Sequence, residues 1–370
     1  MKVKKIITFL ILLSSYCEAQ VSILDNRINY QHPIDFQPKI YTCKKIEVPL
    51  LIDGLINEDA WDKATWTEDF VDIQGSLKAS PYLKTRAKLL WDDQYLYIAA
   101  YLEEPQIWAK LKKRDAVIYY DDDFEVFIDP DGDGHNYLEL EMNALNTFWD
   151  LLVLYPYYID KKRNYMFHWN CDSIRTAVHI EGTLNNPSDI DAYWSVELAI
   201  PLGIFKDFSN THYKPENGMF WRLNFSRVDW PMEIVKCEYT KKTDHNGKVL
   251  AENNWVWSPT GSINMHLPET WGYLYFIDSD TTINTLENRE MIKWGLWQLY
   301  YQMKECVKQI DPSVCKLDKL TTPSIEIADY TFMPKIEMTT HGFEISATDK
   351  SGNLIVIDHR AQLTSYPLKK

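Results

Sequence analysis

Between residues 45 and 277 the sequence is a succession of short apolar or alternating runs, separated by Asp, Asn, Gly and Pro. Runs of this length and pattern are typical of β-strands joined by turns. Because no long helical pattern interrupts them, we expect antiparallel strands that bury one face against a second layer. The sequence therefore predicts an all-β fold, an antiparallel β-sandwich. The clearest runs are 85–91, 95–102, 124–128, 137–142, 176–180, 193–200, 220–228 and 273–277.

The pattern changes after residue 278. Six apolar residues then follow one another at helical spacing, which predicts an amphipathic helix. They are Ile292, Leu296, Leu299, Met303, Val307 and Ile310. Two later runs, 342–347 and 353–358, are separated by a turn sequence and predict a β-hairpin. We expect residues 40–278 to form the sandwich and residues 279–370 to form a C-terminal extension of one helix and one hairpin.

The N-terminus predicts a signal peptide at 1–19. A lysine-rich start precedes the apolar run 6–13, and small residues allow cleavage after Ala19. The apolar run is too short to span a bilayer, and no later stretch reaches transmembrane length. Residues 20–39 would then be an N-terminal leader to the sandwich. We expect an exported protein, located in the periplasm, on the cell surface or in the medium.

Charge and cysteine usage exclude several classes of function. A formal net charge of −14 argues against binding a nucleic-acid backbone or docking on anionic lipid. Five scattered cysteines remain after cleavage, which does not describe a disulfide framework, although Cys306 and Cys315 could pair locally. There is no C-x-x-C, H-E-x-x-H, G-x-S-x-G, P-loop or G-x-G-x-x-G motif.

Two neighbouring strands carry carboxylates on one face. In 124–128 and 137–143 aliphatic residues alternate with polar ones, so each strand sends apolar groups to one face and acids to the other. If the two form a hairpin with a shared apolar face, Glu125 lies opposite Glu139 or Glu141. Like charges across a sheet are unfavourable. Such a cluster needs a Lys or Arg from a neighbouring strand, a cation, a raised pKa or a hydroxyl-rich ligand.

The connection between these strands is an acidic turn. Asp129, Asp131 and Asp133 alternate like the first ligands of a calcium loop, but Leu140 stands where an EF-hand needs its final carboxylate. The turn is either a tight acidic connection or a structural calcium site. Calcium is the one cofactor that the sequence suggests.

Aromatic residues are abundant, with 14 Trp, 23 Tyr and 14 Phe. Most Trp residues are expected in the core, although amphipathic rings also serve as platforms for flat ligands such as sugar rings. Trp255 and Trp257 point the same way from one strand and form either a core layer or a platform. Arg227 and Asp229 add polar groups near a strand end. The candidate stacking residues are Tyr119, Tyr120, Trp149, Trp230, Trp255 and Trp257.

Several motifs occur together in one order along the chain. They are I-D-G-L-I-N-E from residue 52 with Trp61, L-W-D-D from residue 90 with Y-L-Y-I-A, D-D-F-E-V-F-I-D-P from residue 122, W-S-V-E-L-A-I-P from residue 194, W-R-L-N-F-S-R from residue 221, and Trp271-Gly272. This set resembles family 9 carbohydrate-binding modules over residues 40–278. The likeness is strongest to exported proteins of the Bacteroidetes type that carry a C-terminal helical extension.

The resemblance implies a DOMON-like, jelly-roll-like β-sandwich that binds sugars, assists plant-polysaccharide hydrolases such as xylanases, and can hold calcium structurally. It places Trp61, Trp91, Trp194 and Trp221 among the sandwich motifs, and so in the core. In the family two Trp residues clamp a terminal sugar, whose hydroxyls bind Glu, Arg and Asn.

The clamp positions of the family are altered in this chain. The motif acid aligns with Glu125, whereas the clamp positions align near Tyr119 and near Met265-His266, and the Arg position aligns near Glu141. We expect glycan across one sheet face, with the following binding residues: Tyr119, Tyr120, Glu125, Glu139, Glu141, Asn143, Trp149 and His266.

Three hypotheses follow for function. The first is a non-catalytic carbohydrate-binding protein that supports glycan breakdown alongside polysaccharide-degrading enzymes. The second is a glycosidase in which Glu125 and Glu139 or Glu141 act as an acid/base pair. The third is a haem-binding DOMON relative, for which Met142 and Met265-His266 are the only pointers.

Overall fold

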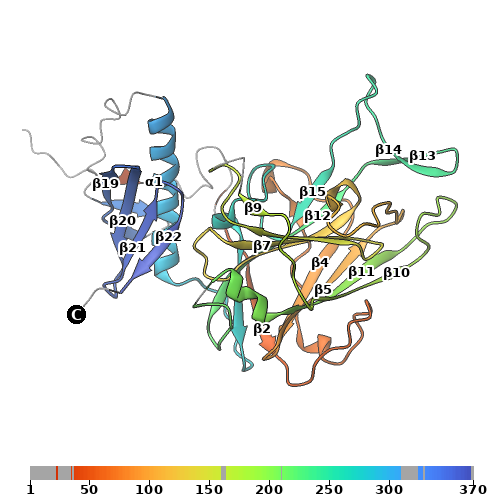
Figure 1. The fold of residues 1–370 in the computed structure, drawn as a ribbon, viewed down its shortest axis with the longest axis horizontal. Helices are drawn as coiled ribbons and strands as arrows, with labels where there is room; N and C mark the ends of the chain where they lie inside the picture. The colour runs from red at the N-terminus through yellow and green to blue at the C-terminus, as the bar shows by residue number, and fades with distance from the viewer. Residues whose placement is uncertain are drawn as a thin grey trace, which may run out of the picture.

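A computed structural model of the chain describes residues 22–23, 35, 37–159, 164–209, 211–309, 324–327 and 330–367. The expected signal peptide and Cys315 lie outside the described residues, so neither the signal nor the Cys306–Cys315 pair is addressed. The chain forms a large β-sandwich and a smaller C-terminal unit beside it (Figure 1). The all-β sandwich predicted from the alternating runs is confirmed.

The sandwich is built from one large sheet. Its strands are β2 (Ile40–Lys45), β3 (Val71–Asp72), β4 (Thr85–Trp91), β5 (Tyr95–Glu103), β6 (Asp123–Asp129), β7 (Tyr137–Asn143), β8 (Phe148–Val153), β9 (Tyr165–Met166), β10 (Arg175–Glu181), β11 (Tyr193–Pro201), β12 (Phe220–Asp229), β15 (Asn253–Val256) and β16 (Gly272–Ile277). Each of the eight runs singled out in the sequence forms one of these strands.

The strand order is β10-β11-β5-β4-β2-β16-β12-β6-β7-β8-β9, while β15 pairs with β12 and β3 with β15. Among the described residues all pairings in this sheet are antiparallel except those of β2, which runs parallel to both β4 and β16. The sheet therefore departs from a purely antiparallel one at β2, the strand that joins its two halves. A separate hairpin of β13 (Met232–Val235) and β14 (Glu238–Lys241) projects from the sandwich (Figure 1).

The core follows from the two-residue period of the strands. On β6 and β7 the side chains that point inward are Phe124, Val126, Ile128, Leu138, Leu140 and Met142. They meet inward residues of β4, β5, β11 and β12, and burial of each such side chain contributes about 1.5–3 kcal/mol. A slip of one residue would send the acids of both strands into this core, so the register is strongly fixed.

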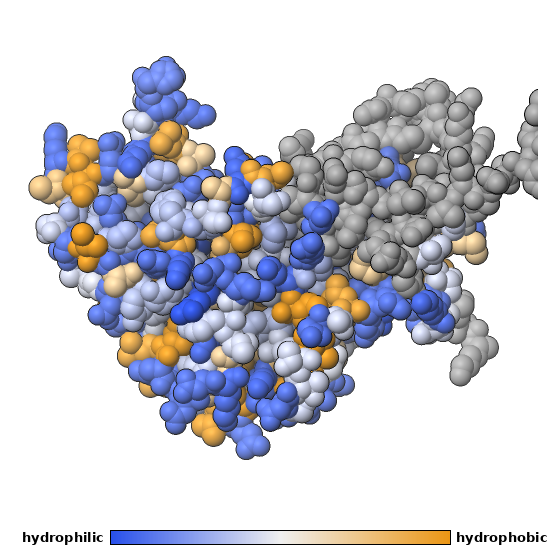
Figure 2. Space-filling model, turned by 180° about the vertical axis from the view of Figure 1, so that it is seen from behind, coloured by the Kyte–Doolittle hydropathy of each residue, from blue (hydrophilic) through white to orange (hydrophobic). Residues whose placement is uncertain are grey.

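The motif tryptophans are buried, as expected. Trp61, Trp91, Trp194 and Trp221 are each at most 3% exposed. Trp61 begins the short 3-10 helix η1 (Trp61–Lys63), and its indole Nε1 donates to Glu197 at 2.8 Å. Trp255 and Trp257 also belong to the sandwich core, which makes that pair a core layer and not a platform. On the face seen in Figure 2, hydrophobic side chains are scattered among hydrophilic ones over the sandwich.

The C-terminal unit packs one helix on a four-stranded sheet. Its elements are α1 (Asn288–Gln309), β19 (Lys335–Thr339), β20 (Gly342–Thr348), β21 (Leu354–Asp358) and β22 (Leu363–Tyr366). The predicted helix and hairpin are both present, and β19 and β22 widen the hairpin. The stripe residues Ile292, Leu296, Leu299 and Met303 are buried in a core of their own, apart from the sandwich core.

A small second sheet joins one strand near the N-terminus to two strands of the C-terminal segment. It consists of β1 (Ser22–Ile23), β17 (Ile325–Ile327) and β18 (Tyr330–Phe332), with β1 parallel to β17. The last two residues of the predicted stripe, Val307 and Ile310, lie outside the described side chains. Among the described residues, no helix combines the length and the apolar character needed to cross a membrane. The domain limits at 39/40 and 278/279 stay a prediction.

Among the described residues, polar contacts join the C-terminal unit to the sandwich at several places. The Tyr273 hydroxyl on β16 donates to Glu290 Oε2 on α1 at 3.1 Å, and two further places lie at loops of the sandwich. At the first, the backbone N–H of Leu363 donates to the Asp133 carbonyl oxygen at 2.9 Å, and Gln362 Nε2 donates to Asp133 Oδ2 at 2.9 Å. At the second, the Tyr301 hydroxyl on α1 donates to Glu269 Oε1. Lys304 Nζ donates to the Tyr158 carbonyl oxygen at 3.2 Å. The unit is thus bonded to β16, to the acidic turn and to two loops of the sandwich.

We expect Tyr301→Phe to destabilise the protein. Glu269 is 3% exposed and its Oε2 has no partner, so loss of the Tyr301 hydroxyl leaves a buried carboxyl without that hydrogen bond. Such a loss costs about 1–3 kcal/mol of the free energy of unfolding, measurable by urea denaturation. Tyr366→Phe is the matched control, because its ring is 52% exposed. Equal stability of the two variants would contradict the role of this contact.

Candidate functional site

The outer face of β6 and β7 carries a row of carboxylates. In the observed register Glu125 lies opposite Glu141, whereas Glu139 lies opposite Phe127. The predicted hairpin is therefore confirmed, and Glu141 is the direct partner of Glu125. Asp123, two residues before Glu125, joins the same face. One carboxylate oxygen from each of Asp123, Glu125 and Glu141 lies within 4.8 Å of the others.

The neighbouring strands supply no positive charge to this row. On β12 the residue opposite Glu125 is Ser226, and on β8 the residue opposite Glu141 is Trp149. Within the part of the chain that the structure describes, no Lys or Arg forms an ion pair with Asp123 or the three glutamates. The simplest structural expectation, neutralisation by a basic residue of a flanking strand, is therefore not met.

The carboxylates are buried although they point away from the core. Glu125, Glu139 and Glu141 are 6%, 6% and 3% exposed. Burial raises the pKa of Glu125 to about 7, and burial together with the charge of Glu125 raises the pKa of Glu139 to about 8. The pKa values of Asp123 and Glu141 are raised well above their usual range for the same reasons. Ionisation of these carboxyl groups therefore costs free energy unless a positive charge or a hydrogen-bond donor compensates it.

Aromatic side chains border the row on the side of η3 (Ile118–Tyr120). The rings of Tyr119 and Tyr120 lie 4.6 Å apart, and the backbone N–H of Tyr119 donates to Glu141 Oε2 at 3.0 Å. Tyr120 is 52% exposed. Trp230 supports this turn, because its indole Nε1 donates to the Tyr119 carbonyl oxygen at 2.8 Å. The amino group of Lys241 in turn lies 3.1 Å from the centre of the Trp230 ring.

A second aromatic group borders the row from the loops after β8 and before η5 (Pro268–Thr270). The rings of Tyr157 and His266 are 4.1 Å apart, and His266 Nε2 lies 3.9 Å from Glu139 Oε1. The Tyr137 hydroxyl and His266 Nδ1 share a hydrogen bond of 2.8 Å. Burial lowers the pKa of His266 to about 3, so its imidazole is neutral at physiological pH. Trp149 on β8 lies opposite Glu141, and its ring is 5.8 Å from that of Phe167.

Asn143 has a different position from the other predicted binding residues. Its side chain is fully buried, and its Nδ2 donates to the Leu111 carbonyl oxygen at 2.9 Å and to Asp121 Oδ2 at 3.0 Å. Its Oδ1 accepts from the backbone N–H groups of Leu145 and Thr147. The carboxamide therefore organises the turn after β7 and has no spare atom for a ligand.

The site contains residues that the sequence reasoning did not select. Asp123 shares the two-residue period of Glu125, so the strand pattern could have identified it. Ser226 required knowledge of which strand flanks β6. Tyr157 and Phe167 lie in loops, and no periodic signal connects them to the row.

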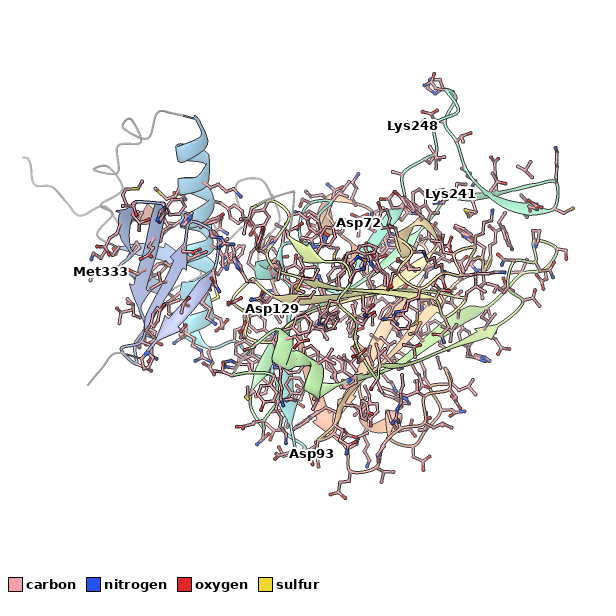
Figure 3. The ribbon with its side chains drawn as sticks, in the orientation of Figure 1. Asp72, Asp93, Asp129, Lys241, Lys248 and Met333 are labelled. Carbon is pink, nitrogen blue, oxygen red and sulfur yellow. The ribbon has the colours of Figure 1, made fainter. Side chains whose placement is uncertain are left out.

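In the acidic turn, backbone N–H groups of the turn itself donate to the carboxylates. Asp129 accepts from the N–H groups of Gly132 and Gly134 at 2.9 Å each, and Asp133 from the N–H of His135 and from Gln362. Both glycines have positive φ, 64° and 85°, which a residue with a side chain rarely adopts. Asp129 lies on the side of the sandwich next to the C-terminal unit (Figure 3). The oxygens of Asp129, Asp131 and Asp133 also lie within 4.8 Å of one another, and calcium there stays a prediction.

Arg227 and Asp229 form a buried ion network. Arg227 is fully buried, and its Nη2 lies 2.6 Å from Glu104 Oε2 and 3.3 Å from Asp229 Oδ1. Its Nη1 donates to Thr85 Oγ1 at 3.1 Å and to the Glu103 carbonyl oxygen at 2.8 Å. These contacts tie β12 to the opposite half of the sandwich, so Arg227 serves the fold.

The candidate axial ligands for a haem do not lie on one face of the sheet. Met142 belongs to the sandwich core, whereas Met265 packs in a separate cluster on the outer face with Phe127 and Tyr137. Met142 and His266 therefore cannot reach one metal as an axial pair.

The comparison with protein families matches most of the sandwich. Residues 52–249 match the model described as Carbohydrate family 9 binding domain-like, which is more than half of the 370 residues. The chain belongs to this family. In this Carbohydrate family 9 binding domain-like protein the matched segment runs from β3 to β14 and includes the whole carboxylate row, whereas β2, β15, β16 and the C-terminal unit lie outside it.

Solved structures also show similarity. A carbohydrate binding module family 9 from Caldicellulosiruptor kristjanssonii in complex with cellotriose has 19% identity and a TM-score of 0.40, with 67% of this chain and 100% of that chain covered. A module of the same family and organism in complex with glucose has 19% identity, the same coverage and a TM-score of 0.41. A candidate carbohydrate-binding protein from Bacteroides uniformis has 14% identity and a TM-score of 0.47, with 65% and 100% covered. No curated protein matches.

We expect Arg227→Met to lower the free energy of unfolding by about 3–5 kcal/mol, because it leaves buried Glu104 and Asp229 without their cation. Urea denaturation measures the loss. Arg175→Met is the control, since Arg175 is exposed and contacts the face of Tyr95. A loss no larger than that of the control would show that the network does not stabilise the sandwich.

Proposed function

We propose that this protein binds carbohydrate on the outer face of β6, β7 and β8. The observation that carries the proposal is the row of buried carboxylates without a basic partner, bordered on two sides by aromatic rings. Sugar rings present C–H faces that pack on aromatic side chains, and their hydroxyls donate to carboxylates. The row also lies within the segment that matches the family model.

The exposure of the individual residues suggests how a glycan would lie. Tyr165 extends the second aromatic group, because its ring lies 6.0 Å from that of Tyr157. Tyr120, Tyr165 and Phe167 are 52%, 41% and 37% exposed, whereas Glu125 and Glu139 retain only a few per cent. A sugar ring would therefore rest on the aromatic rim and direct its hydroxyls toward the carboxylates below. Tyr119, Trp149 and His266 would form the sides of the site, and Glu141 its floor. Asn143 would act through the turn that it organises.

The biological setting that we propose is extracellular or periplasmic glycan capture. The protein would be exported and would hold plant or other polysaccharide fragments for polysaccharide-degrading enzymes. The lysine-rich N-terminus with its short apolar run and the acidic net charge support this setting.

A hydrolytic role is less well supported by the geometry. Glycosidases place their two carboxyl groups on either side of a bond that is being cut. Glu125 and Glu141 instead lie side by side on one sheet face, with oxygen atoms within 4.8 Å, and both are buried. A glycosidic bond has no place between them. The carboxylates are better suited to holding a ligand or an ion than to cutting a sugar.

We expect Tyr120→Ala to weaken glycan binding about tenfold, a loss of about 1.4 kcal/mol, because it removes an exposed stacking ring. Isothermal titration with cello- and xylo-oligosaccharides, chosen after a glycan array, measures the change. Tyr366→Ala is the matched control, with the same 52% exposure on the C-terminal unit. The proposal fails if the wild-type protein binds no glycan, or if the two variants lose affinity equally.

A further inference from the structure

The carboxylate row contains polar atoms that no part of the described protein satisfies. Asp123 is fully buried; its Oδ1 accepts from the backbone N–H of Val228 at 3.3 Å, and its Oδ2 has no hydrogen-bond partner. Glu139 Oε2 is also buried and unpartnered. An unsatisfied buried carboxylate oxygen is costly, so these atoms indicate that a component of the site is not part of the chain.

A serine hydroxyl on the adjacent strand β12 also lies beside the carboxylate row. Ser226 lies directly opposite Glu125 and is fully buried, and its Oγ has no partner other than the adjacent Glu125 carboxyl group. A hydroxyl that donates to a carboxylate keeps its lone pairs available for a cation. Four side chains from three adjacent strands therefore meet on one face, and among them Asp123 Oδ2 lacks any partner. They are Asp123 and Glu125 on β6, Glu141 on β7 and Ser226 on β12.

We propose that Asp123, Glu125 and Glu141 bind a calcium-type divalent cation, with Ser226 as a further oxygen ligand. The donors are all oxygens, which suits a hard cation and not zinc, for which Cys and His would be expected. Calcium–oxygen distances of about 2.3–2.6 Å allow two ligands of one ion to be as far as about 5 Å apart. One oxygen of each of the three carboxylates lies within 4.8 Å of the other two, which is close enough for one ion without rearrangement of the strands.

Three other groups of carboxylates lie among the described residues, and partners reach part of each. In the group of Asp53, Glu58 and Glu197, Glu197 accepts from Trp61 Nε1 and from the backbone N–H groups of Asp53 and Gly54, whereas both Glu58 oxygens lack a partner. In the acidic turn, both carboxylate oxygens of Asp129 accept backbone N–H groups, whereas Asp131 Oδ1 has no partner. In the group of Glu104, Asp122 and Asp229, Arg227 supplies the positive charge. The row on β6 and β7 differs because no cationic side chain and no donor reaches Asp123 Oδ2. This cation site does not depend on the proposed sugar binding, although an ion there would fix the floor of that site.

The first experiment measures calcium affinity without sugar. The purified full chain is stripped with EDTA and titrated with CaCl₂ by isothermal titration calorimetry. We expect Asp123→Asn to weaken binding at least about tenfold, since ligand charge sets calcium affinity. Asp131→Asn, which changes the acidic turn, should leave this binding unchanged. The absence of calcium binding, or a loss with Asp131→Asn alone, would overturn the proposal. If Asp123→Asn does not fold, Ser226→Ala replaces it with the same expectation.

The second experiment uses stability to test the same site. Without calcium, Glu141→Gln places a neutral amide opposite Glu125 in place of a carboxyl group whose ionisation is unfavourable there, so it should raise the melting temperature above that of the wild type. With saturating calcium the order should reverse, because only the wild type keeps all three carboxylates. An order that is the same with and without calcium overturns the proposal. Since no sugar is present, this result is independent of whether glycan binding is found.

Discussion

The strand alternation of β6 and β7 is the constraint on which the candidate site depends. Apolar side chains at every second position fix the register against the core, because a slip of one residue would bury the acids there. The same register then places Glu125 opposite Glu141. The repulsion between these carboxylates is thus a consequence of core packing, and the hydrophobic face is large enough to enforce it.

Features that depend on the local strand pattern could be predicted from the sequence, whereas contacts between distant segments could not. The period of two decides which residues of β6 and β7 share a face, so the sequence places Glu125 opposite Glu139 or Glu141, and the observed register decides for Glu141. The covering of that face could not be foreseen, because the rings of Tyr157 and Phe167 arrive from loops without a pattern. Asn143 also lies at a position that the alternation assigns to this face, yet its carboxamide is taken up by Asp121 and by backbone groups of Leu111, Leu145 and Thr147. Arg227 is placed by a contact across the sandwich, which strand propensity does not encode.

The C-terminal unit is connected to both loops that border the site. Tyr158, whose carbonyl oxygen accepts from Lys304, is the neighbour of Tyr157 in the chain. Glu269, which accepts from Tyr301, follows His266 by three residues. Tyr157 and His266 are in ring contact with each other. The aromatic wall of the site beside Glu139 is therefore held from behind by α1, although the unit itself lies outside the segment that matches the family.

The parallel strand β2 also has a consequence for the order of folding. It lies between β4 and β16, so the two halves of the sheet meet only when residues 40–45 pair with residues 273–277. Contacts between segments so distant in sequence carry a high entropic cost of loop closure and slow the folding of β-rich domains. The sheet cannot close on a growing chain until its last strand has emerged. Until then β6 and β7 can form their hairpin, and the carboxylate row remains open to water and to dissolved ions.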